Sequence, residues 1–188
     1  MFMFDVETLG TESNSVILSI ACIQFNPEEK PSYNELVDSA FFVKLDSKDQ
    51  VERLNRTISK STLEWWSGQP ELVKQKSLNV YENDLKSEVG VEMFHDWVKK
   101  FENYDKTTVW ARGSLDQMVI NSLENKLQMN PIFPYYAWRD VRTAIDIYTG
   151  SNNGYCHVEH PEFDSNAVVK HDPVHDCALD ISMLVYGK

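Results

Sequence analysis

Three apolar runs near the start of the chain constrain its fold more than any other feature. Residues 1–6, 16–25 and 40–45 are rich in β-branched and aromatic side chains, and polar or turn-forming residues separate them. Runs of this length and composition predict strands, and the turn signals between them favour pairing of consecutive strands. The first part of the chain therefore predicts a three-stranded antiparallel meander.

The spacing of apolar residues changes to a helical period from about residue 61. The sequence STLE at residues 61–64 matches a capping box and predicts the start of a short helix. Beyond it we expect helices at residues 70–77, 86–101, 114–129 and 173–186, strands at 107–111 and 135–138, and a loop at 152–166. A meander followed by alternating helices and strands predicts an α/β fold, a mixed sheet of antiparallel and parallel strands flanked by helices.

Length and composition fit a folded enzyme-sized domain. The chain has 188 residues, 42% hydrophobic and 12% aromatic, which excludes a disordered acidic protein, and no linker divides it, so residues 1–188 are predicted to form one domain. Asp5 and Glu7 interrupt the apolar N-terminus and no apolar run reaches about 18 residues, so we expect no signal peptide and no membrane partner. Three cysteines, an odd number, favour a reducing compartment and a cytoplasmic location.

The net charge weighs against one class of partner. Asp and Glu number 29 against 18 Lys and Arg, for a net charge of -11. Nucleic acids are usually bound by basic surfaces, so this balance disfavours a nucleic-acid partner unless a specific motif overturns it.

Two carboxylates stand close together at the end of the first predicted strand. Asp5 and Glu7 are two residues apart, and alternation along a strand places both side chains on one face. Like charges side by side are costly unless a cation lies between them. The pair is a candidate set of metal ligands, and ordinary surface acids are the competing interpretation.

A third acid, Asp116, follows the predicted strand at 107–111 and opens the helix predicted at 114–129. Binding sites on α/β sheets tend to lie where strands end and helices begin. The helix dipole alone also favours an acid at this position, so both interpretations stand for Asp116.

The last predicted helix offers a histidine and aspartates in its first turns. The sequence HDPVHDCALD at residues 171–180 contains two overlapping H-x-x-x-x-D patterns. One joins His171 to Asp176, and the other joins His175 to Asp180.

We select between the two patterns by the faces of the helix. Asp172 followed by Pro173 predicts the N-cap and the first helical residue. Asp180 flanks the apolar stripe and is expected to reach the sheet, whereas Asp176 is expected to face solvent. His175 falls in the first turn, where the dipole disfavours a charged imidazole and helps to keep it neutral. The predicted pair is therefore His175 with Asp180.

Taken in chain order, these motifs resemble the DEDDh exonucleases, which are named for four acids and a histidine. Longer segments resemble the bacteriophage exonuclease A group and compact mycobacterial-type exoribonucleases, namely STLEWW (61–66), ARG (111–113), RDVRT (139–143) and HDPVHDCALD (171–180). The resemblance implies a ribonuclease H-like fold and metal-dependent removal of nucleotides from the 3′ end of a nucleic acid. One departure is Leu115, where many family members have phenylalanine before the aspartate.

The resemblance also assigns roles to five residues. Two divalent cations, Mg²⁺ or Mn²⁺, are expected to be held by carboxylates, and the ligands would be Asp5, Glu7, Asp116 and Asp180. His175, with an ordinary pKa of about 6.5, is expected to take a proton from the attacking water. Two such ions would cancel the charge of the four acids and turn an acidic pocket into a phosphate site.

Eight residues are weaker candidates for contacts with a substrate: Thr8, Leu9, Gly10, Trp65, Trp66, Arg112, Arg139 and Arg142. In the family, a leucine equivalent to Leu9 often wedges against the terminal base, and a partly buried turn residue is an equal alternative. Adjacent residues on a helix point about 100° apart, so one tryptophan is expected to pack while the other stacks on a base. The arginines suit phosphate contacts, and structural ion pairs are the alternative.

The predicted function is a 3′-5′ exonuclease that releases nucleoside monophosphates from single-stranded DNA or RNA. No residue that would read the 2′-hydroxyl is identified, so both substrates remain. The alternatives are a non-catalytic acidic mimic of nucleic acid and an inactive nucleic-acid-binding module. The acidity disfavours a broad electrostatic grip, so weak processivity on single-stranded ends is expected, in the host cytoplasm if the chain is of phage origin.

Overall fold

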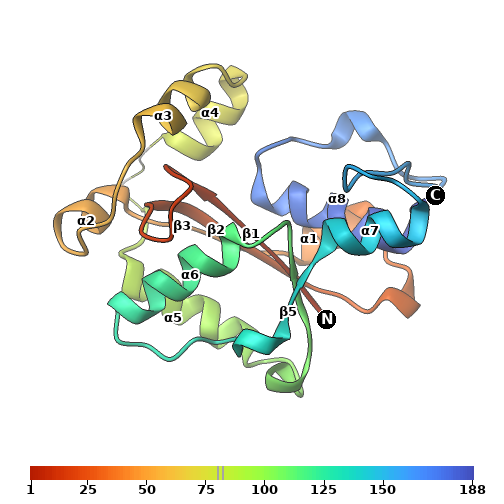
Figure 1. Cartoon of the computed structure of the whole chain (residues 1–188), viewed down its shortest axis with the longest axis horizontal. Coiled ribbons are helices and arrows are strands. Elements are labelled where there is room, and N and C mark those ends of the chain that lie inside the picture. Colours follow the sequence, from red (N-terminus) through yellow and green to blue (C-terminus); the bar gives the residue numbers. More distant parts are fainter. Residues whose placement is uncertain (80, 82) are drawn as a thin grey trace.

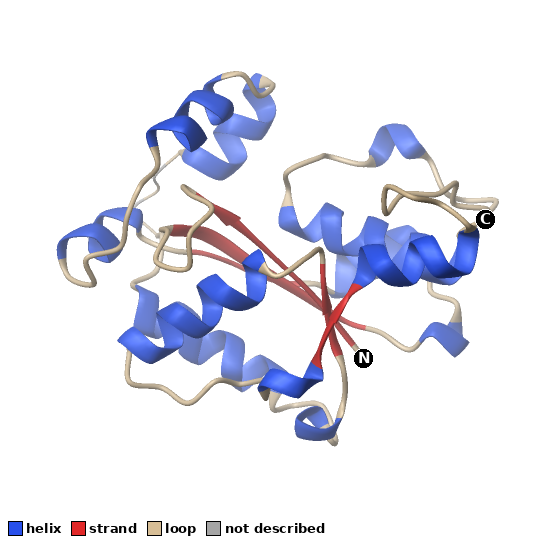
Figure 2. Ribbon diagram, in the orientation of Figure 1, coloured by secondary structure: helices blue, strands red, loops and turns tan. Residues whose placement is uncertain are grey.

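A mixed sheet forms the centre of the molecule. The computed structural model describes residues 1–79, 81 and 83–188, and within them five strands lie in the order β3-β2-β1-β4-β5 (Figures 1 and 2). The strands are β1 (Phe2–Thr8), β2 (Ile17–Gln24), β3 (Phe41–Lys44), β4 (Val109–Ala111) and β5 (Trp138–Asp140). The first three pair antiparallel, whereas β4 and β5 run parallel to β1. The predicted meander and the predicted mixed sheet are confirmed.

Helices cover both faces of this sheet. They are α1 (Tyr33–Ser39), α2 (Ser47–Glu52), α3 (Lys60–Ser67), α4 (Glu71–Leu78), α5 (Ser87–Val98), α6 (Leu115–Lys126), α7 (Val141–Thr149) and α8 (Pro173–Tyr186). Figure 1 shows α5 and α6 on one side of the sheet and α1, α7 and α8 on the other. The α/β architecture expected from the alternating patterns is therefore present.

Alternation along β1 divides the core into two layers. Phe2 and Phe4 are buried in the cluster that α5 and α6 cover, while Met3 is buried in the cluster that contains residues of α8. Asp5 and Glu7 follow Met3 at steps of two, so their side chains lie on the same face of the sheet as Met3, which is the face that α8 covers. The strand thus directs two acids toward the last helix.

Several element boundaries differ from the sequence prediction. Helix α3 begins at Lys60 with Ser59 as its N-cap, because the Ser59 hydroxyl accepts the Thr62 N–H, so the predicted cap at residue 61 is wrong. Residues 135–138 were expected to be a strand, but Tyr135–Ala137 is a 3₁₀ turn and the strand follows it. Helix α1 was not predicted, and its Ser32 forms a capping box with Glu35.

The hairpin of α3 and α4, residues 60–78, lies apart from the two main helix layers (Figure 1). It packs on the sheet through a separate cluster of buried residues, Leu9, Val16, Leu18, Trp66 and Val73. Val169, from the segment before α8, packs against this cluster. The hairpin therefore touches both the end of β1 and the approach to α8.

One further observation concerns membranes. In the part of the chain that the structure describes, none of the helices combines the length and the apolar character needed to cross a bilayer.

Candidate active site

Acidic side chains from three elements meet in one pocket at the carboxyl ends of β1 and β4. The pocket has a volume of about 360 Å³. The titratable acids that line it come from β1, α6 and α8, and they are Asp5, Glu7, Asp116, Asp176 and Asp180. His171 lines the same pocket, from the segment that precedes α8.

Asp116 joins the start of α6 to the first strand. Its Oδ1 accepts the backbone N–H of Val6 at 3.3 Å, and Val6 is the residue between Asp5 and Glu7 in β1. Only 6% of Asp116 is exposed. This bond fixes the helix start against the strand, so the position predicted for Asp116 from the strand-then-helix pattern is the one that the structure shows.

Asp176 faces the pocket, which corrects the expectation that it faces solvent. Asp176 and Asp180 are one turn apart in α8, and residues four apart lie on the same side of a helix. At 100° per residue their side chains are only about 40° apart around the helix axis. If one of them points toward the sheet, the other does as well. Both acids of the overlapping patterns therefore reach the pocket.

His171 is the histidine of the pocket. It adopts a left-handed backbone conformation, with φ of 59°, just before the helix begins. Its backbone N–H donates to Asp176 Oδ2 at 3.0 Å, which links it to the first turn of α8. A non-glycine residue in this region costs about 1–3 kcal/mol and persists only where neighbouring contacts hold it. The imidazole is thereby presented to the acids.

His175 lies elsewhere, and the predicted pairing of His175 with Asp180 is not the one that the structure brings together. His175 Nδ1 lies 2.7 Å from the hydroxyl of Tyr33, a residue of α1. His175 is absent from the pocket lining. The physical reason is the position of α1, which packs against α8 on the side that His175 faces and which the sequence did not predict.

Asp180 already has a cationic partner. The guanidinium of Arg112 pairs with both carboxylate oxygens of Asp180, with Nε to Oδ2 at 3.2 Å, and its Nη1 donates to the carbonyl of Gly154. Arg112 also lies over the ring of Tyr155, with 4.2 Å from Cζ to the ring centroid. The ion-pair alternative for Arg112 is therefore the one that the structure shows, and it neutralises the acid that the sequence analysis assigned to metal binding.

The remaining acids carry raised pKa values because they are buried beside one another. Burial raises the pKa of Asp5 and of Glu7 well above the usual range, and the neighbouring carboxylates add to the effect. Burial raises the pKa of Asp116 to about 7, and it raises that of Asp176 to about 7 with a further contribution from Asp180. Clusters of perturbed groups in a cleft are typical of functional sites.

The donor set fits a hard divalent cation. One ligand atom from each of Glu7, His171 and Asp176 lies within 4.8 Å of the other two. Most donors here are carboxylate oxygens, which Mg²⁺ and Mn²⁺ prefer. Arg112 is already paired with Asp180. A cation bound among the other acids would balance their negative charge. The residues present therefore suit a divalent metal site.

Three residues predicted to touch a substrate have structural roles at the turn after β1. Leu9 is 6% exposed and packs in the small cluster under the α3–α4 hairpin. The Thr8 hydroxyl donates to the carbonyl of Gly10 at 2.6 Å. None of the three lines the acidic pocket. Leu9 is thus a buried residue of this turn, and its predicted contact with a terminal base stays a prediction.

The two adjacent tryptophans divide as expected, one inside and one outside. Trp66 is 1% exposed and its Nε1–H donates to the carbonyl of Thr8 at 3.0 Å. Trp65 is 45% exposed, and its ring stands edge-on to the ring of His171. Packing is thus the role of Trp66, and Trp65 is the one available to a substrate.

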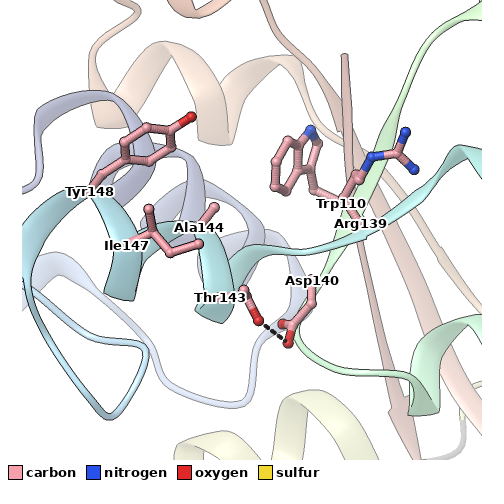
Figure 3. Close-up of a pocket in the computed structure, with 7 residues that line it drawn as sticks. All are labelled: Trp110, Arg139, Asp140, Thr143, Ala144, Ile147 and Tyr148. Carbon is pink, nitrogen blue, oxygen red and sulfur yellow. Dashed lines mark hydrogen bonds between the residues drawn. The ribbon is translucent and has the colours of Figure 1, made fainter.

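Arg139 does not reach the acids. It lines a separate cavity of about 300 Å³ between the edge of the sheet and α7, where its guanidinium donates to the carbonyls of Tyr136 and Trp138. Figure 3 shows this cavity, with Trp110 across from Tyr148 and the guanidinium of Arg139 pointing away from α7.

Arg142 lies nearer to the acidic pocket. Its guanidinium is next to Gly113, where φ is +87° and an added Cβ would meet Arg142 Nη2 at 2.5 Å. Gly113 itself precedes α6 and donates its N–H to Asp140 Oδ1 at 3.2 Å. Glycine is favoured at this position because a φ of +87° is a backbone conformation that other residues rarely adopt.

Two other side chains of the pocket were not predicted from the sequence. Tyr155 and Lys170 both line it, and they come from the irregular segment between α7 and α8. No period or motif marks such residues, because a loop side chain is placed by tertiary contacts such as the stacking of Tyr155 on Arg112.

The chain is similar to known exonucleases over almost its whole length. Residues 1–185 match the family model described as the Rv2179c-like 3′-5′ exoribonuclease domain. The chain is 32% identical over 206 aligned positions to a protein of Enterobacteria phage T4 described as an exodeoxyribonuclease, covering 99% of this chain and 88% of that protein. Its fold resembles the nuclease domain of 3′hExo, a DEDDh family member solved with rAMP, with a TM-score of 0.60, 12% identity and coverage of 97% of this chain and 91% of that one.

Proposed function

The chain belongs to the Rv2179c-like family of 3′-5′ exoribonuclease domains, within the DEDDh exonucleases, and from this premise we propose that it removes nucleotides one at a time from the 3′ end of single-stranded nucleic acid. It is a 3′-5′ exonuclease, and its family implies a nucleic-acid substrate and dependence on divalent metal ions. We propose further that residues 1–188 act as one exonuclease domain.

The observation that carries the proposal is the convergence of acids and one histidine from β1, α6 and the start of α8. We assign the metal ligands to Asp5, Glu7, Asp116 and Asp176, because among the residues that the structure describes these pocket acids form no ion pair with an arginine, whereas Asp180 does. Two divalent ions bound there would activate a water molecule and offset the charge of the scissile phosphate. Mg²⁺ or Mn²⁺ are the ions we propose, since the donors are hard oxygens.

His171 is the proposed general base. Burial lowers the pKa of His171 below its ordinary value, which keeps the imidazole neutral and able to accept a proton near neutral pH. The attacking water gives its proton to the imidazole and its oxygen bonds to phosphorus. The bond from phosphorus to the 3′ oxygen of the preceding nucleotide breaks, and that oxygen keeps the electron pair and takes a proton from solvent. The products are a nucleoside 5′-monophosphate and a strand one residue shorter that ends in a 3′-hydroxyl.

Arg112 and Asp180 serve to shape the pocket rather than to bind metal in this proposal. Their bidentate pair, stacked under Tyr155, fixes one wall beside Asp176. The exposed faces of Trp65 and Tyr155 are available for stacking on bases, which is tolerant of sequence. These contacts suit a short grasp of a single-stranded 3′ end.

The relatives suggest two candidate substrates, RNA and DNA. The family description names an exoribonuclease, and the phage protein is described as an exodeoxyribonuclease. We propose activity on single-stranded RNA, DNA or both. The three cysteines and the phage relative support a cytoplasmic site of action, in the host cell if the chain is a phage protein.

The test uses 5′-end-labelled single-stranded RNA and DNA, each incubated with the protein and Mg²⁺ or Mn²⁺. A ladder of products shortened one nucleotide at a time from the 3′ end, with release of nucleoside monophosphates, is expected. Asp5→Asn, which keeps the shape of the side chain and removes its charge, is the control and should abolish the ladder. Failure of both substrates, or equal products from the control, would overturn the proposal.

A further inference from the structure

The α3–α4 hairpin makes several contacts with the segment that carries His171. We propose that this hairpin is a positioning element, which acts through Trp65, Lys76 and Ser77 to hold the imidazole of His171 toward the acids. The inference rests on the proposed role of His171 as general base. The three hairpin residues are positioning residues, since none of them lines the acidic pocket.

Ser77 holds the backbone of His171 from the side of α4. Only 4% of Ser77 is exposed, and its hydroxyl donates to the carbonyl of His171 at 3.2 Å. The N–H of His171 donates in the opposite direction, to Asp176. Both backbone polar groups of this left-handed residue are therefore bonded, one to the hairpin and one to α8.

Trp65 contacts the ring of the same histidine. The centroids of the two rings are 4.8 Å apart and their planes meet at 88°, an edge-to-face arrangement. Trp65 also packs edge-on against Trp66, which is bonded to the carbonyl of Thr8 at the end of β1. A continuous row of contacts thus runs from the strand that supplies two acids to the imidazole.

Lys76 holds the residue that follows His171. Its Nζ lies 3.0 Å from Oδ2 of Asp172, and the other oxygen of Asp172 accepts the N–H of Val174 as the N-cap of α8. The ion pair joins α4 to the first turn of α8. Residues 171 and 172 are thereby fixed to the hairpin through a carbonyl, a ring and a carboxylate.

The hairpin offers a matched control on the same helix. Lys74 forms a similar surface ion pair, with Glu71 at 2.9 Å, and this pair stays within α4. Lys74→Met and Lys76→Met remove the same charge from the same helix, so any general loss of attraction for nucleic acid affects both. Only Lys76→Met breaks the connection to Asp172.

The experiment measures kcat and KM on a short single-stranded substrate with the full chain and Mn²⁺. Ser77→Ala and Lys76→Met are expected to lower kcat by about threefold to tenfold, as loss of one hydrogen bond would, with KM equal to that of Lys74→Met. Lys76→Arg keeps the ion pair and should restore kcat. Unchanged kcat in both variants, or a change confined to KM, would overturn the inference.

A second readout needs neither metal nor turnover. The ring resonances of the five histidines are recorded by NMR in the metal-free protein, and that of His171 is identified by its loss in His171→Ala. Trp65→Leu should shift this resonance, Trp65→Phe should move it less, and Lys74→Met should leave it in place. A resonance that stays fixed in Trp65→Leu would refute the positioning role. If the wild-type protein releases no nucleotide, the proposed function fails, but the NMR shift still tests whether Trp65 contacts the ring of His171.

Discussion

Glu124 and the acids of the pocket are both buried, and their surroundings differ in one respect. Glu124 lies in α6 with 1% exposed, and its Oε1 is 2.8 Å from His95 Nε2 and accepts the N–H of Ile132 at 3.1 Å. Asp116 lies at the other end of the same helix and accepts the N–H of Val6, and it lines a pocket together with Asp5, Glu7, Asp176 and Asp180. Glu124 is paired with a histidine and a backbone N–H, whereas Asp116 accepts a backbone N–H and shares its pocket with four other acids.

This difference separates a structural acid from a functional one. A buried acid with internal donors links elements and stabilises the fold, whereas a group of buried acids without cations destabilises it. Burial alone therefore does not mark a site. The mark is a set of neighbouring buried acids whose negative charges repel one another, and the pocket at the end of β1 has this character.

The variant Asp116→Asn gives the strongest test of the difference between the pocket acids and Glu124. The amide oxygen can still accept the N–H of Val6, so the fold is kept while one proposed metal ligand is lost. Nucleotide release is expected to fall by about 10³-fold, equivalent to ~4 kcal/mol. In the metal-free protein at pH 7, the free energy of unfolding is expected to rise, because one of the mutually repelling acids is gone. Activity within tenfold of wild type would contradict the assignment.

The opposite behaviour is expected at Glu124. Glu124→Ala leaves His95 and the N–H of Ile132 without their acceptor, so the free energy of unfolding should fall by about 1–3 kcal/mol. The rate of nucleotide release per folded molecule should stay at the wild-type value below the melting temperature. Thermal unfolding and release assays on the same sample measure both. Glu124→Gln, which retains an acceptor oxygen, is the matched control and should lose less stability.

The pH dependence of the metal-free protein sharpens the comparison further. Burial raises the pKa of Asp116 and of Asp176 to about 7, whereas an unfolded aspartate titrates near 4. Between these values the folded protein binds more protons than the unfolded one, so the free energy of unfolding falls as the pH rises from about 4 to about 7. The melting temperature of the metal-free protein is therefore expected to fall as the pH rises over this range.

Two comparisons assign this slope to the pocket. Asp116→Asn should show a shallower fall over the same pH range, and Glu124→Gln should follow the wild type. Saturating Mg²⁺ or Mn²⁺ should raise the melting temperature at pH 7 because the ion binds the folded form. Equal slopes in wild type and Asp116→Asn, or no effect of either ion, would count against a cation site made of these acids.

The sequence was sufficient for the features that depend on local periodicity. Alternation placed Asp5 and Glu7 on one face of a strand, and Asp172 with Pro173 marked the start of α8 at the residue where it begins. The meander and the order of the motifs along the chain followed from the same kind of pattern.

The assignment of the histidine could not be made from periodicity. Which histidine reaches the acids depends on α1, which occupies the side of α8 that His175 faces, and on the left-handed backbone of His171. Both are tertiary features. The separation of Asp176 from Asp180 was an error of another kind, because residues four apart share a helix face and this was available from the sequence.

The most direct test of the account is nucleotide release by His171→Ala beside His175→Ala, with single-stranded RNA and DNA and with Mg²⁺ or Mn²⁺. We predict that His171→Ala lowers kcat by about 10²-fold or more, as loss of a general base does, while remaining folded. His175→Ala should stay within about twofold of wild type, since a substitution away from the chemistry changes little. Loss of turnover in His175→Ala with His171→Ala fully active would contradict the account.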